Sequence, residues 1–95
     1  MRIKISEGFR LLLSEQVLYI AEDKPKAARK FKDELIKEIR RIPTMPFSYR
    51  KSIYFEQDDI RDLIFKGYVI TFRVKEEQKV IEIFGFTKYR EKIKL

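Results

Sequence analysis

Apolar and polar residues alternate over residues 2–6, at the start of the chain. This period of two is typical of a half-buried strand with Ile3 and Ile5 facing inward. From residue 7 to residue 21 the period becomes helical, and Ser6 is in place to cap the helix. The residues at helical spacing form a stripe on the inner face of this amphipathic helix and are Phe9, Leu12, Leu13, Gln16, Val17 and Ile20.

A second helix is predicted from Pro25 to about Ile42. Proline is tolerated in the first turn of a helix, where its missing N–H costs nothing, so Asp23-Lys24-Pro25 indicates the end of one helix and the start of the next. Two helices joined this tightly form an antiparallel hairpin. The apolar face of this helix comprises Ala28, Phe31, Leu35, Ile39 and Ile42. Cations lie largely on the rest of its surface, which is typical of a solvated face.

Three strands are predicted in the second half of the chain. Pro43 and Pro46 end the second helix, and residues 47–59 have no sustained period. The connections between the strands are so short that only antiparallel pairing is open to them, with Gly67 at positive φ in the first turn. The strand-like runs are residues 60–65, 68–75 and 79–86.

The last of these runs carries apolar residues on both faces. Ile81 and Ile83 alternate with a second apolar set that shares its face with Glu82 and comprises Val80, Phe84 and Phe86. This pattern predicts a strand that is buried on both sides or covered by a partner. Gly85 is expected to mark a bulge or a close backbone approach.

The order of these elements predicts an α+β fold in two layers. An antiparallel sheet carries a helical hairpin on one face, in the order β-α-α-β-β-β. The chain has 95 residues and a mass of 11.6 kDa, which fits a single domain over residues 1–95. No stretch is long and apolar enough to cross a bilayer and no signal segment is evident, so no membrane contact and a cytoplasmic location are expected.

Charge and composition narrow the chemistry. Lys and Arg number 22 against 15 Asp and Glu, which gives a net charge of +7 and favours a polyanion or an acidic protein as partner. The chain has no Cys and no His. Disulfides, thiolate or imidazole metal ligands and histidine catalysis are therefore excluded, and neither a metal nor a cofactor is expected.

Several short motifs follow one another along nearly the whole chain. They are Tyr19-Ile20-Ala21, Asp23-Lys24-Pro25-Lys26-Ala27-Ala28, Phe31, Pro46, Tyr49-Arg50, Ile60-Arg61-Asp62-Leu63, Gly67-Tyr68-Val69-Ile70 and Phe72-Arg73-Val74. In this order they resemble the RelE/ParE superfamily, the small basic toxins of type II toxin–antitoxin systems that are often labelled plasmid stabilisation proteins. The resemblance implies a growth-arresting toxin whose basic surface is covered by a cognate antitoxin.

The superfamily has two branches with different targets. RelE-like members cut messenger RNA on the ribosome, and ParE-like members poison DNA gyrase. In the RelE-like pattern one Arg follows the Gly-Tyr of the middle strand and another lies two residues past the Gly of the last strand. Val69 and Thr87 occupy these positions here and supply no positive charge to a phosphorane. The resemblance therefore favours a ParE-like toxin without turnover, whose target-binding residues are Arg61, Lys88, Tyr89 and Arg90.

Two alternatives stay open. One is a RelE-like, ribosome-dependent and metal-independent endoribonuclease that uses Arg61, Arg73, Lys88, Tyr89 and Arg90. The other is a general nucleic-acid-binding module based on charge alone. For Arg61 a purely structural role is as well supported by the sequence as a functional one. In that role it is a side chain on the sheet surface that pairs with a nearby carboxylate.

All toxin readings imply a partner. An acidic, partly disordered antitoxin is expected to fold across exposed apolar and basic surface. Leu11 and Leu18 lie off the stripe of the first helix, and with Ile81 and Ile83 they are the expected antitoxin contacts. A homodimer and a toxin–antitoxin heterotetramer are both compatible with the resemblance.

Overall fold

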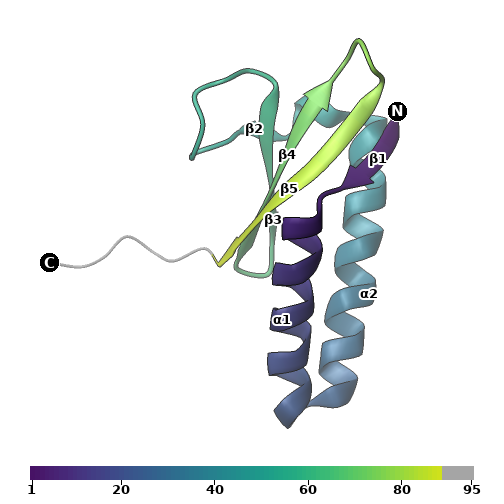
Figure 1. Cartoon of the computed structure of the whole chain (residues 1–95), viewed down its shortest axis with the longest axis vertical. Helices are drawn as coiled ribbons and strands as arrows, with labels where there is room; N and C mark the ends of the chain where they lie inside the picture. Colours follow the sequence, from purple (N-terminus) through teal and green to yellow (C-terminus); the bar gives the residue numbers. More distant parts are fainter. Residues whose placement is uncertain (89–95) are drawn as a thin grey trace, which may run out of the picture.

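A computed structural model describes residues 1–88 of the chain as two layers, with a helical hairpin on one face of a five-stranded sheet (Figure 1). The α+β fold expected from the sequence is confirmed. The elements in chain order are β1 (Arg2–Ile5), α1 (Glu7–Asp23), α2 (Pro25–Arg41), the short 3₁₀ helices η1 (Ile42–Thr44) and η2 (Pro46–Ser48), β2 (Arg50–Lys51), β3 (Ile60–Phe65), β4 (Tyr68–Lys75) and β5 (Val80–Lys88).

Both helices begin where the sequence places them. The Ser6 hydroxyl accepts a hydrogen bond from the Phe9 amide at 3.1 Å, which caps α1, and Pro25 is the first residue of α2. The stripe predicted for α1 is wrong at Leu12, whose side chain is exposed. On α1 only Phe9 and Leu13 are buried, because the far ends of both helices extend beyond the sheet (Figure 1). Within residues 1–88 no helix could span a membrane.

The sheet has the strand order β1-β5-β4-β3-β2. The three-strand meander is confirmed, and its first turn places Lys66 and Gly67 at φ values of 46° and 84°, as a tight hairpin requires. Two edges go beyond the sequence prediction. The strand β1 pairs in parallel with β5, and β2 forms within residues 47–59, where no strand was expected.

A bulge in β5 corrects the predicted assignment of its faces. Thr71 pairs with Gly85 and Phe72 pairs with Ile83, so Phe84 is the extra residue. The extra residue shifts the alternation, and Phe86 therefore lies on the helix-covered face together with Ile81 and Ile83. There Phe86 makes an edge-to-face contact with Phe9, at 5.7 Å between ring centroids.

The core fills the space between the helices and the sheet. Phe9, Leu35 and Phe72 are among its completely buried side chains. On the opposite face of the sheet the loop of residues 52–59 folds back over the strands, where Phe55 contacts Phe84 at 5.7 Å between ring centroids. The molecule therefore has an apolar layer on both faces of the sheet, and the thicker one lies under the helices.

Candidate functional site

Arg61 anchors the long loop that precedes β3. Its guanidinium donates hydrogen bonds to the backbone carbonyls of Asp58, Phe47 and Tyr49, at 2.8, 3.2 and 2.9 Å, and lies 4.9 Å from the Phe47 ring centroid. The expected pairing of Arg61 with a nearby carboxylate is therefore wrong, because backbone carbonyl groups accept the hydrogen bonds of its guanidinium. All five donors of a guanidinium are held in one plane, which suits it to join several loop segments.

Asp62 is a second anchor, and the sequence analysis missed it. Its buried carboxylate accepts hydrogen bonds from the Thr71 hydroxyl at 2.9 Å and from the Ile53 amide at 3.0 Å, and it pairs with Arg50 at 3.5 Å. A carboxylate inside a strand of apolar residues was the available signal, since a buried charge requires partners. Arg61 and Asp62 together hold the loop on the sheet.

The three described cations proposed for RNA cleavage, Arg61, Arg73 and Lys88, do not meet. Arg73 pairs with Ile60 on the face turned away from the helices, and an ion pair at 3.9 Å links it to Asp59. Lys88 pairs with Tyr68, whose side chain faces the core. These two levels lie five residue steps apart along β4, about 17 Å at 3.4 Å per residue. Tyr89 and Arg90 lie outside the described residues.

The positions that carry arginine in RelE-like nucleases are direct neighbours in the sheet. Val69 of β4 pairs with Thr87 of β5 on one side and with Ile64 of β3 on the other. Val69 is completely buried, whereas Thr87 is exposed. An uncharged row thus crosses three strands, and it includes both positions at which the RelE-like pattern has arginine.

Two tyrosines beside the sheet serve in packing. Tyr68 stacks on Phe86 at 5.0 Å between ring centroids, and Tyr49 makes an edge-to-face contact with Phe72 at 5.4 Å. Burial raises the pKa of both hydroxyls, so both stay protonated at neutral pH and neither is suited to act as a base. Among residues 1–88 no group of three or more carboxylates could hold a metal ion.

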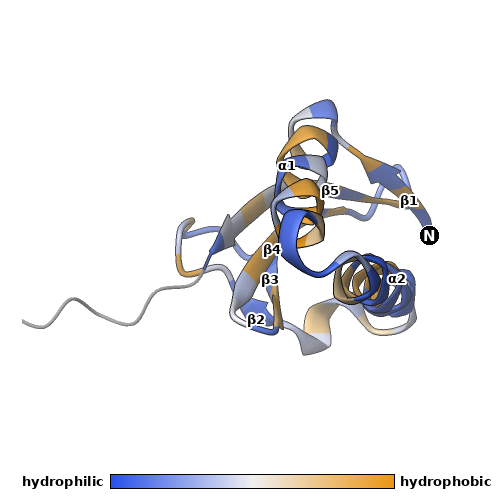
Figure 2. Cartoon of the chain, turned by 90° about the horizontal axis from the view of Figure 1, so that it is seen from below, coloured by the Kyte–Doolittle hydropathy of each residue, from blue (hydrophilic) through white to orange (hydrophobic). Residues whose placement is uncertain are grey.

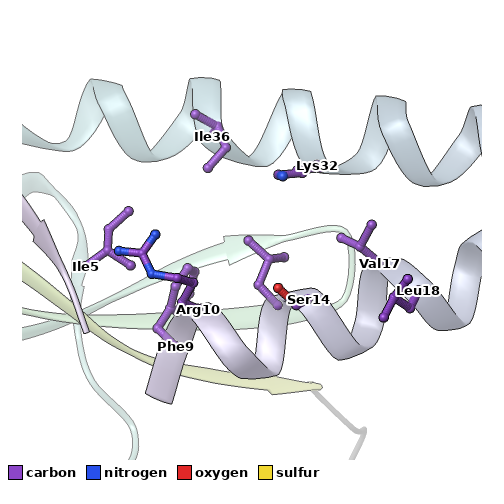
Figure 3. Close-up of a pocket in the computed structure, with 9 residues that line it drawn as sticks. Ile5, Phe9, Arg10, Ser14, Val17, Leu18, Lys32 and Ile36 are labelled. Carbon is purple, nitrogen blue, oxygen red and sulfur yellow. The ribbon is translucent and has the colours of Figure 1, made fainter. Parts of the chain in front are cut away.

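A groove of about 330 Å³ lies between the two helices (Figure 3). Val17 and Leu18 form one end, Ile5 lies at the other, and Ile36 of α2 lies toward the Ile5 end (Figure 3). Arg10 and Lys32 add positive charge from opposite helices, so an apolar floor has a cationic border. The groove is lined by Ile5, Phe9, Arg10, Leu13, Ser14, Val17, Leu18, Lys32 and Ile36.

The expected antitoxin contacts separate into three groups. Leu18 lines the groove and its side chain is 67% exposed, so a partner can reach it. Leu11 is exposed but is absent from the groove lining. Ile81 and Ile83 were wrongly expected at the surface: they are completely buried in the core, because they pair with Val74 and Phe72 on the helix-covered face of the sheet.

Comparison with known families identifies the chain. A family model described as "ParE toxin of type II toxin-antitoxin system, parDE" matches residues 3–93. The chain belongs to the ParE toxin family. The ParE-like branch favoured by the sequence is thereby confirmed, and the chain is a toxin of ParE type from a type II toxin–antitoxin system.

A solved ParE-type structure supports the fold of this family member. A chain of the "Chromosomal ParDE TA system from P. aeruginosa" superposes with a TM-score of 0.77 at 17% sequence identity, over 95% of this chain and 97% of that chain. Nothing matches in a search of curated proteins. At this low identity the structural similarity shows the fold alone. Membership of the ParE toxin family rests on the match to the family model.

Proposed function

We propose that this protein inhibits DNA gyrase by binding it and that a cognate antitoxin neutralises the toxin in the cytoplasm. The observation that carries the proposal is the uncharged row of Ile64, Val69 and Thr87 in a chain of the ParE family. Cleavage of an RNA backbone needs positive charge on the phosphate and a base for the 2′-hydroxyl, all within hydrogen-bond reach. The row supplies neither, and a toxin that acts by binding needs neither.

The dispersion of the remaining cations supports the same proposal. Arg61 donates to three loop carbonyls, and Arg73 of β4 and Lys88 of β5 lie at different levels of the sheet. We assign target contact to Lys88 and to Tyr89 and Arg90, and to Arg61 only through the loop that it holds in place. No specific observation favours the endoribonuclease reading.

The groove between the helices is the proposed antitoxin site. Its apolar floor suits the apolar face of an amphipathic segment, and Arg10 and Lys32 suit acidic residues along the rim of that segment. An acidic, partly disordered antitoxin that orders on binding has this chemistry. Leu18 is the exposed groove residue with most apolar surface to lose on binding.

A supercoiling assay tests the proposed target. Purified toxin added to gyrase and relaxed plasmid is expected to stop supercoiling and to trap cleaved DNA, and addition of the antitoxin is expected to restore activity. Full gyrase activity at saturating toxin contradicts the proposal. A reconstituted translation mixture serves as the second arm: cleavage of messenger RNA there, abolished by Tyr89→Phe, would establish the endoribonuclease instead.

A further inference from the structure

The two helices of the hairpin carry opposite charge. The sequence of α1 has four acidic residues and one basic residue, whereas α2 has seven basic and three acidic residues. In Figure 2, which looks along α2, the side of this helix turned away from the sheet is blue, the colour of hydrophilic residues. The excess positive charge of the helical hairpin therefore lies on α2.

Five cations form a stripe along the solvent side of α2. Lys26 and Arg40 mark its ends, about 21 Å apart at 1.5 Å rise per residue. All five are exposed and lie opposite the buried residues of the helix, and Asp33 is the one acidic residue among them. The members of this basic stripe are Lys26, Arg29, Lys30, Lys37 and Arg40.

Among the described residues, lysines elsewhere in the structure form ion pairs, whereas those of the basic stripe do not. Lys51, Lys66 and Lys75 pair with carboxylates at 2.8, 2.6 and 3.2 Å. Within residues 1–88, the ion pairs formed by α2 use Glu34 and the Glu38–Arg41 pair, so no carboxylate lies within 4.0 Å of the five stripe cations. The five cations are therefore not held in ion pairs by this part of the chain and can reach an external anion.

We propose that the basic stripe binds the phosphate backbone of duplex DNA. An acidic protein is a poorer fit, because the cores of protein interfaces are depleted in lysine and the stripe contains no apolar side chain. Nucleic-acid interfaces are strongly positive and polar. An α-helix fits the major groove of B-form DNA, whereas the major groove of A-form RNA is too narrow for side chains to enter.

The cations lie within one arc of about 100° around the axis of α2. At 100° per residue Arg29 and Arg40 lie toward one flank of the stripe and Lys30 toward the other, with Lys26 and Lys37 between them. The sequence pattern of α2 predicted a solvated face, and the proposal assigns duplex DNA to that face.

This inference goes beyond gyrase inhibition, and its test contains neither gyrase nor antitoxin, so either proposal can fail without the other.

Salt dependence of DNA binding provides the test. The triple variant Lys26→Gln, Lys30→Gln, Lys37→Gln removes stripe charge, and the matched control Lys51→Gln, Lys66→Gln, Lys75→Gln removes three ion-paired lysines. Affinity for a labelled 20-base-pair duplex is measured by fluorescence anisotropy between 50 and 200 mM salt. The slope of log affinity against log salt is expected to fall by about three for the stripe variant and by less than one for the control.

Other outcomes overturn the proposal. Equal slopes for the two triple variants would show that DNA binds outside the basic stripe. Absence of DNA binding by the wild-type chain at 50 mM salt would refute the proposal altogether. Stronger competition by polyglutamate or by duplex RNA than by unlabelled duplex DNA assigns the stripe to a different polyanion. The single variant Lys37→Gln, with an expected slope change of about one, keeps the test decisive if the triple variant folds poorly.

Discussion

Arg61 and Asp62 are adjacent on β3, and they hold the same loop by opposite chemistry. Arg61 donates to backbone carbonyls near the edge of the helix-covered face, whereas Asp62 accepts from an amide and a hydroxyl on the other face. Side chains of neighbouring strand residues point to opposite faces, so one dipeptide reaches two parts of the loop. A segment without periodicity is thereby given a defined conformation.

Replacement of Arg61 tests this anchoring role. Arg61→Ala is expected to lower the free energy of unfolding by about 1–3 kcal/mol, because hydrogen bonds from a charged donor are lost together with the contact to Phe47. Arg61→Lys should recover part of this loss, since one ammonium cannot replace the planar guanidinium. Urea unfolding measures both. Arg29→Ala on the exposed face of α2 is the control, and its free energy of unfolding should change by no more than about 0.5 kcal/mol. An equally small change for Arg61→Ala would show that the loop does not depend on Arg61.

The bulge in β5 is the element-scale feature that decides which face of the sheet Phe86 lies on. Alternation in the sequence predicted the strand and the special role of Gly85, because both are local signals. The change of face at Phe84 was not predictable in this way, since it depends on pairing with β4 across the sheet. The same reason explains why the sequence predicted β1 as a strand but did not place it beside β5.

Gly85 is required at the bulge for lack of space. A Cβ atom there would lie 2.9 Å from the Cβ of Thr71. The Cβ of Thr71 is bonded directly to the backbone, so rotation of the side chain cannot move it aside. Gly85→Ala is expected to destabilise the fold by about 1–3 kcal/mol. Gly8→Ala is the matched control: nothing lies within 4 Å and the residue is helical, so a gain of about 0.4–1 kcal/mol is expected. Thermal unfolding of the two variants checks the opposite signs, and equal melting temperatures would refute the steric argument.

At the scale of the whole molecule, the fold was more predictable than its surfaces. Periodicity, Pro25 and the short turns define the helices and the meander, because these features act within a few residues. The groove arises between α1 and α2, and its members Ile5, Leu18 and Ile36 come from three elements. Such a surface is visible only after the elements have packed, and for this reason Leu11 and Leu18 were grouped together from the sequence although only Leu18 lines the groove.

The two leucines therefore provide a matched test of the antitoxin site. Leu18→Glu is expected to weaken antitoxin binding at least tenfold, because about 1.5 kcal/mol or more of apolar burial is lost and an acidic residue meets an acidic partner. Leu11→Glu introduces the same charge at an exposed position outside the groove and should change affinity less than about threefold. Isothermal titration at 0.15 M salt measures both, since screening over about 8 Å suppresses distant charge effects.

Under these conditions the stripe variant Lys26→Gln, Lys30→Gln, Lys37→Gln should bind the antitoxin as the wild type does, because the stripe lies on the solvent side of α2 and the groove on the side facing α1. Equal weakening by Leu11→Glu and Leu18→Glu would move the antitoxin to the outer face of α1, and loss of binding in the stripe variant would merge two surfaces that the structure keeps apart.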